Sequence, residues 1–108
     1  MTTFDERERA FEKKFALDQE LKFRATARRD ALIGEWAAAR LGLSGAAASD
    51  YVKAVRKLEV TDKARDAVFE KVLRDLTDAG VAVTPTELRE VMGRFMARVL
   101  AEISERSP

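Results

Sequence analysis

The stretch TPTELREVMGRFMARVLAEI, residues 84–103, predicts an amphipathic helix. Thr84 stands at the N-cap position, Pro85 at the first helical position, and Glu87 where it completes a capping box. From Leu88 onward the large apolar residues recur at spacings of four, three, four and four, which places them on one face of an α-helix. A helix with one apolar face needs other elements to cover that face.

Three more helices are predicted upstream, because five glycines and two prolines leave few places where a helix is interrupted. The expected breaks are LGLSG (residues 41–45), a weaker one near LEVTD (58–62), and AGVAVTP (79–85). The expected helices cover residues 17–41, 46–58, 62–79 and 85–105, with Thr61 as N-cap of the third and Gly80 at its C-terminal end. Four amphipathic helices with short connections predict an all-α fold, a four-helix bundle over residues 17–108.

The composition argues against several classes of function. The chain has neither cysteine nor histidine, and so lacks the usual thiolate nucleophile, general base and metal ligand. Charged residues make up 36% of the chain but sum to a net charge of +1, which does not favour a nucleic-acid partner. No apolar run is long enough to span a bilayer, and the N-terminus lacks the order of a signal peptide. We therefore expect a cytoplasmic protein that is not an enzyme, holds no metal and does not insert into a membrane.

The N-terminal stretch TTFDERERAFEKKFALDQE, residues 2–20, places three of the six phenylalanines among charged residues. At about 100° per residue, Phe4, Phe11 and Phe15 share one side of a helix. Their centre lies roughly 90° from the face that we expect to pack on the bundle. That expected core face consists of Leu17, Leu21, Ala25, Leu32, Trp36 and Ala39. One straight helix cannot direct both faces squarely into one core.

Two interpretations are open for this stretch. In the first, the chain kinks near residues 16–19 and the three phenylalanines complete the core. In the second, residues 1–16 form an arm outside the core, disordered or frayed in the free protein and helical when bound to a partner. A segment of ~12–15 residues is marginal as an isolated helix in water, which favours the second interpretation. The arm then implies a partner with a groove that can enclose a helix.

The sequence also resembles a known family. The stretches TFDERERAFEKKFALDQELKFRATARR (residues 3–29), LIGEWAAARLGLSG (32–45) and AGVAVTPTELR (79–89) are similar to the zeta subunits, which inhibit the F-type ATPase (ATP synthase) of alphaproteobacteria. The resemblance implies a four-helix bundle with a mobile N-terminal arm. It implies that the arm folds into a helix at a catalytic interface between alpha and beta subunits, near the gamma rotor, and blocks ATP hydrolysis but not synthesis. The free chain is expected to be a monomer, and the bound one peripheral to the inner membrane through the ATP synthase.

The same resemblance assigns roles within the arm. The apolar anchors would be Phe4, Phe11 and Phe15, and the polar contacts would be Asp5, Arg7, Arg9, Glu12, Lys13 and Lys14.

An alternative function is a small helical module that binds adenine nucleotide weakly as a regulatory ligand. The candidate residues are two basic groups, Arg24, Arg28 and Arg29, and Lys53, Arg56 and Lys57. The sequence has no Gly-rich motif that would cradle phosphates, and no other cofactor is expected. The preferred explanation for both groups is a solvated helix face, with the aliphatic stems of the first group covering apolar surface. Arg28 falls on the expected core face, where it is a candidate to pair with a carboxylate at the bundle edge.

Overall fold

The fold consists of four α-helices joined by turns. The computed structural model describes residues 3–61 and 66–106, with side chains described for residues 18–58 and 66–103. The helices are α1 (Thr3–Arg40), α2 (Gly45–Thr61), α3 (Ala67–Asp78) and α4 (Pro85–Arg106). No strand occurs in the described ranges, which confirms the all-α, four-helix fold predicted from the sequence. Within those same ranges, no helix has an apolar stretch long enough to cross a membrane.

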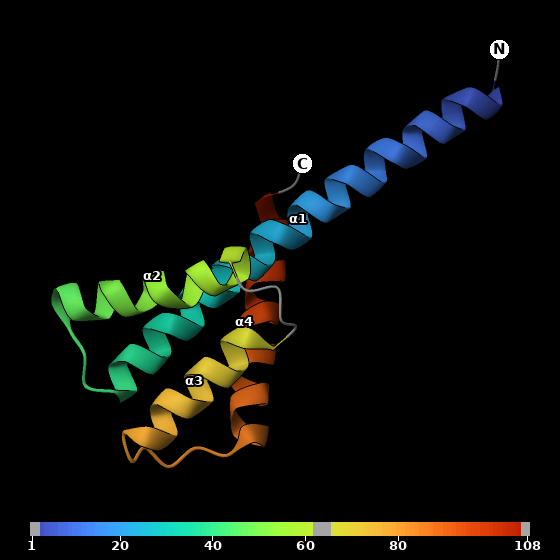
Figure 1. Ribbon diagram of the computed structural model, residues 1–108. Coiled ribbons are helices and arrows are strands. Elements are labelled where there is room, and N and C mark those ends of the chain that lie inside the picture. The colour runs from blue at the N-terminus through green and yellow to red at the C-terminus, as the bar shows by residue number, and fades with distance from the viewer. Residues whose placement is uncertain (1–2, 62–65, 107–108) are drawn as a thin grey trace.

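Helix α1 is the central element of the bundle. Its C-terminal half packs against α2, α3 and α4, and α3 also contacts both α2 and α4 (Figure 1). Over the residues that the structure describes, the backbones of α2 and α4 do not come close to each other, and α1 and α3 each contact both of them. The bundle is therefore organised around the second half of one long helix.

The first half of α1 projects beyond the other three helices (Figure 1). The helix is continuous from Thr3 to Arg40, 38 residues, and passes through residues 16–19 without a break. At about 1.5 Å per residue such a helix is roughly 57 Å long. It accounts for most of the longest dimension of the molecule, which measures 64 × 28 × 28 Å. The structure thus describes the arm as a straight extension of α1, and not as a segment that kinks back to the core.

The core has two parts. The main cluster takes buried residues from all four helices, including Ile33 of α1, Val55 of α2, Leu76 of α3 and Leu88 of α4. The second cluster takes them from only two helices: Ala25 and Leu32 of α1, and Val99 of α4. The second cluster lies closer to the arm along α1, and its described residues come from α1 and α4.

The buried side of α1 is broader than the expected core face. Ala25 and Leu32 are buried as expected and Leu21 and Trp36 are half-buried, but Ala39 is exposed. The expectation for Ala39 was wrong. The buried residues that lie outside the expected face are Asp30, Ile33, Gly34, Ala37 and Ala38. The reason is that three helices surround this part of α1, so that most of its circumference faces a neighbour.

Local signals set several helix ends. The Glu87 amide donates to Thr84 Oγ1 at 3.1 Å, which confirms Thr84 as the N-cap of α4. Gly80 ends α3 with a φ of 77°, and the next amide, of Val81, donates back to the Leu76 carbonyl at 2.9 Å. Gly42 has the same positive φ just beyond the end of α1.

The connection between α2 and α3 differs from the prediction. Helix α2 continues to Thr61, and α3 begins at Ala67 with Asp66 as its N-cap residue. The expectation that Thr61 caps a helix starting at residue 62 was therefore wrong. Leu58 packs against the main core cluster and extends α2. The β-branched residues that follow disfavour a helix by only a few tenths of a kcal/mol each, about 0.7 at most.

Candidate partner-binding site

The residues predicted to contact a partner lie on the projecting part of α1. The described backbone is helical over all of them: Phe4, Asp5, Arg7, Arg9, Phe11, Glu12, Lys13, Lys14 and Phe15. Their side chains lie outside the described side chains, so their individual roles stay predictions. The backbone register alone places positions 4, 11 and 15 on one side of α1.

The base of the arm is a solvated helix. Residues 18–24 are exposed except for half-buried Leu21, and Phe23 keeps 66% of its surface exposed. Arg24 Nη2 lies 2.7 Å from Glu20 Oε1, one helical turn away. A solvated pair of this kind contributes only about 0.3–0.5 kcal/mol to helix stability. The base therefore keeps its helical form through local interactions more than through packing.

The second core cluster sets the direction in which α1 leaves the bundle. Ala25 and Leu32 pack against Val99 of α4, and Phe95 and Met96 of α4 cover the edges of this contact. Small side chains such as Ala25 let the two helices approach closely. Because this contact involves both helices directly below the base, it positions the arm relative to the bundle.

A buried carboxylate lies further along α1, and sequence reasoning missed it. The side chain of Asp30 is 0% exposed, and the Arg29 guanidinium donates to its Oδ1 through Nη2 at 2.8 Å and Nε at 3.2 Å. A charge out of water is stable only when it is paired and hydrogen-bonded. The sequence held a signal, since Asp30, Ile33 and Ala37 recur at spacings of three and four and so share a face.

Two of the three arginines of the first basic group form ion pairs with carboxylates of α1. Arg24 pairs with Glu20, and Arg29 pairs with Asp30. Arg28 is exposed, so the expectation that it sits on the core face was wrong. The neighbouring residue, Arg29, makes the contact with a carboxylate instead, because one position further along the helix turns its guanidinium toward Asp30.

The second basic group borders an open groove between α1 and α2, with a volume of about 410 Å³. Lys53 and Arg56 line it together with Glu35, and the remaining walls are mainly apolar, formed by residues such as Val52 and Leu43. Lys57 is exposed and does not line the groove. The structure thus brings two of the six candidate nucleotide-binding residues to one groove and leaves Arg24, Arg28, Arg29 and Lys57 outside it.

Polar contacts connect α3 to its neighbours. The Tyr51 hydroxyl of α2 donates to Asp75 Oδ2 of α3 at 2.8 Å, and Lys71 Nζ lies 3.1 Å from the same oxygen. Burial and the adjacent Asp75 carboxylate raise the pKa of Tyr51 well above its usual value. At the other end of α3, the Arg89 guanidinium stacks on the Phe69 ring at 3.7 Å and reaches Asp66 Oδ1 at 3.2 Å. These contacts hold the bundle together and lie apart from the arm.

The fold and this site define a class of protein: a small helical bundle from which one long helix projects. In the described part of the chain, no cluster of acidic residues could hold a metal ion. The sequence model of the family called ATPase inhibitor subunit zeta matches residues 1–102. The chain belongs to this family of ATPase inhibitors. No curated protein matches it.

Proposed function

We propose that this protein inhibits the bacterial F-type ATPase by inserting its arm as a helix at a catalytic interface between alpha and beta subunits, near the gamma rotor. Rotation in the hydrolytic direction closes this interface on the arm and stops. Rotation in the synthetic direction opens the interface and releases the arm, so that ATP synthesis continues. The protein then acts in the cytoplasm, at the periphery of the membrane that holds the ATP synthase.

The projecting arm is the observation that carries this proposal. Residues 3–16 extend α1 beyond all the other helices (Figure 1). At about 1.5 Å per residue this part of the helix is roughly 21 Å long, enough to enter deeply between two subunits. Membership of an ATPase inhibitor family supports an ATPase as the target.

The physical chemistry of the arm suits binding that depends on a partner. The arm continues a helix that the bundle has already nucleated, so its folding avoids the costly first turn. Burying three phenylalanine side chains stabilises the complex by ~5–9 kcal/mol. Ordering a dozen frayed residues costs about 1–2 kcal/mol each for the backbone alone. The partner must therefore add hydrogen bonds and complementary charges. The acidic and basic residues of the arm can pair with such groups.

Deletion of residues 1–16 tests the proposal. We expect the truncated protein to unfold at nearly the same temperature as the full chain, because the deleted segment projects beyond the other three helices (Figure 1). We expect it to lose inhibition of ATP hydrolysis by purified F-type ATPase that has been freed of its own inhibitor. ATP synthesis in inverted membrane vesicles should proceed at the same rate with either protein.

A full-length variant serves as the companion to this deletion. Phe11→Ala combined with Phe15→Ala keeps the arm and its charges, and should weaken inhibition by about tenfold or more. Inhibition by the truncated protein equal to that of the full chain would show that the arm is not the inhibitory element. Unfolding of the truncated protein would show that the arm belongs to the core.

The second candidate function, binding of an adenine nucleotide, rests on the groove between α1 and α2. There the base would lie on the apolar wall around Val52, and the phosphates would meet Lys53 and Arg56. Titration with ADP should shift the amide signals of residues 48–56 with saturation, and Lys53→Gln combined with Arg56→Gln should abolish that shift. A full chain whose amide signals do not move would rule this function out.

A further inference from the structure

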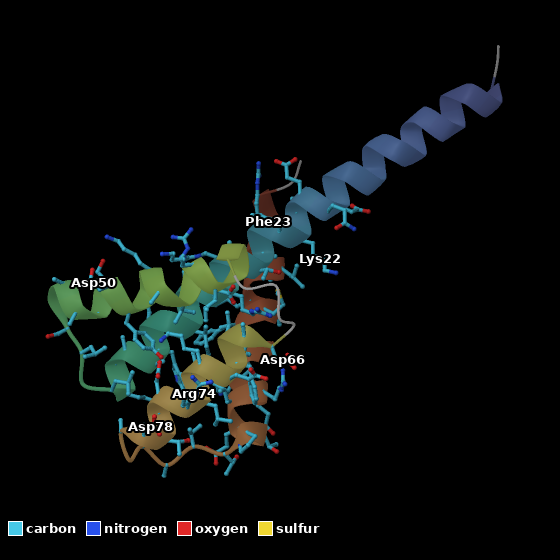
Figure 2. All side chains as sticks on the ribbon, viewed as in Figure 1. Lys22, Phe23, Asp50, Asp66, Arg74 and Asp78 are labelled. Carbon is cyan, nitrogen blue, oxygen red and sulfur yellow. The ribbon has the colours of Figure 1, made fainter. Side chains whose placement is uncertain are left out.

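A second groove lies at the base of the arm. It has a volume of about 400 Å³ and runs between α1 and the C-terminal part of α4. Its walls are apolar, with Leu21 and Ala25 on the α1 side and Met96 and Leu100 on the α4 side. Leu100 keeps 51% of its surface exposed, although it is a large apolar side chain. Figure 2 labels Lys22, which also lines this groove, where α1 leaves the bundle.

The outer face of α4 beside this groove carries no charge. At about 100° per residue, Gly93, Met96, Ala97 and Leu100 follow one another within less than a third of the circumference. The charged residues of the same turns, such as Arg98, lie on the other side of the helix. Charged residues make up 36% of this chain, so an exposed stretch of helix without them is unusual here. The surface is also smooth, because Gly93 and Ala97 are exposed and a Cβ added at Gly93 would meet no atom within 4 Å.

The groove and the arm share one side of α1. The groove is bordered on α1 by Asp18, Lys22 and Thr26, which recur every four residues. In the continuous register of α1 these positions lie within about 40° of the direction of positions 4, 11 and 15. A partner that binds the side of the arm marked by positions 4, 11 and 15 therefore meets this groove next, further along the same helix.

We propose that this groove is a second docking surface for the same ATPase, and that it receives a helix of the ATPase with an uncharged, apolar face. This inference rests on the proposed function and adds the anchor to the arm. Small residues at 93 and 97 let the incoming helix approach α4 closely, and Leu100 inserts between its side chains. Since α4 packs on α1 directly below the arm, docking there holds the bundle in place when the rotor pushes on the arm.

A charge placed on this surface tests the proposal. Ala97→Glu puts a carboxylate on the uncharged face, at its edge away from Met96, and Leu100→Glu puts one in the groove wall. The matched control is Ala54→Glu, at an exposed position in the interior of α2, away from the groove. Full-length proteins would be compared for unfolding temperature, affinity for purified F-type ATPase and inhibition of ATP hydrolysis. The variants Ala97→Glu and Leu100→Glu should each lose affinity by about tenfold or more, while Ala54→Glu matches the unchanged protein.

The outcomes separate the two proposals. If the unchanged protein inhibits and Ala97→Glu and Leu100→Glu both bind as it does, the groove is not a docking surface and the proposed function still stands. If the unchanged protein fails to inhibit, both proposals fall. The free protein could also sediment as a dimer that Ala97→Glu dissociates, with no change in affinity for the ATPase. In that case the groove binds a second copy of this chain and the inference is overturned. Should Leu100→Glu lower the unfolding temperature, Ala97→Glu and Leu100→Gln decide the result.

Discussion

Asp30 shows how a single residue shapes the inside of the bundle. Its carboxylate is buried in the middle of α1, and its positive partner Arg29 is the preceding residue of the same helix. Removing a charge from water costs several kcal/mol, and the adjacent guanidinium offsets part of that cost. Arg29 reaches solvent, with 21% of its side chain exposed, so it connects the buried charge to the surface.

Tyr51 is the residue at which a small change should have a measurable effect on stability. Tyr51→Phe removes the hydroxyl that donates to Asp75 and leaves the ring in place. We expect the free energy of unfolding at pH 7 to fall by about 1 kcal/mol, the usual net value of such a hydrogen bond. Asp75 keeps its ion pair with Lys71, so no buried charge is left alone. Denaturant titration of both proteins measures the difference.

The pH dependence of this difference has a definite sign. The folded state raises the pKa of Tyr51 above its usual value of 10.0, since burial and Asp75 both favour the neutral phenol. The stabilisation is therefore complete below about pH 10 and is lost as the pH rises above that value. Wild-type protein should lose stability relative to Tyr51→Phe in this alkaline range. An equal decline of the two proteins would contradict the contact.

At the scale of elements, the two ends of the single helix α1 have different surroundings. Its C-terminal half is enclosed by three neighbours, whereas residues 3–16 extend beyond the ends of all of them (Figure 1). The comparison of lengths explains this difference, since α1 has 38 residues and α2, α3 and α4 have 17, 12 and 22. Part of α1 must extend past the bundle, whatever the direction in which its side chains point.

Hydrogen exchange of the free protein should divide α1 at the base of the arm. We expect the amides of residues 3–16 to exchange within roughly 100-fold of the rate of an unstructured peptide, because this part of α1 projects beyond the other helices and includes a helix end. The amides of residues 33–38, in the main cluster, should exchange only through global unfolding. Addition of F-type ATPase should then slow exchange in the arm.

The internal control for this measurement is α4. Its C-terminal turns also lie near the edge of the bundle, but Val99 is buried in the second core cluster. They should exchange more slowly than the arm and faster than the main cluster. Protection of residues 3–16 as strong as that of residues 33–38 would contradict the division of the chain into arm and bundle.

At the scale of the whole molecule, the two core clusters have different roles. The main cluster unites four helices and provides most of the buried apolar surface. The second joins α1 and α4 among the described residues, and it lies next to the arm. Apolar surface stays uncovered along one edge of this contact, in the groove lined by Leu21 and Leu100. The packing of α1 on α4 therefore both supports the arm and leaves the groove beside it.

The sequence analysis favoured an arm outside the core because the phenylalanine positions point away from a narrow expected core face. This physical reason is incomplete. In the structure Ile33 is buried, although it lies within about 20° of the direction of positions 4, 11 and 15 on the same helix. The helical phase alone therefore does not exclude those positions from a core. Distance from the bundle separates them from it, and distance depends on where the other helices end.

The sequence by itself determined the four helices and several of their ends. Thr84 and Gly80 act through contacts within one or two turns, so their effect is independent of the rest of the fold. Only the tertiary structure decided that α1 is enclosed around Asp30 and that its first half projects. It alone decided that Leu21 and Leu100 meet across a groove. Those features depend on the relative lengths and crossing of helices far apart in the chain, and no local pattern encodes them.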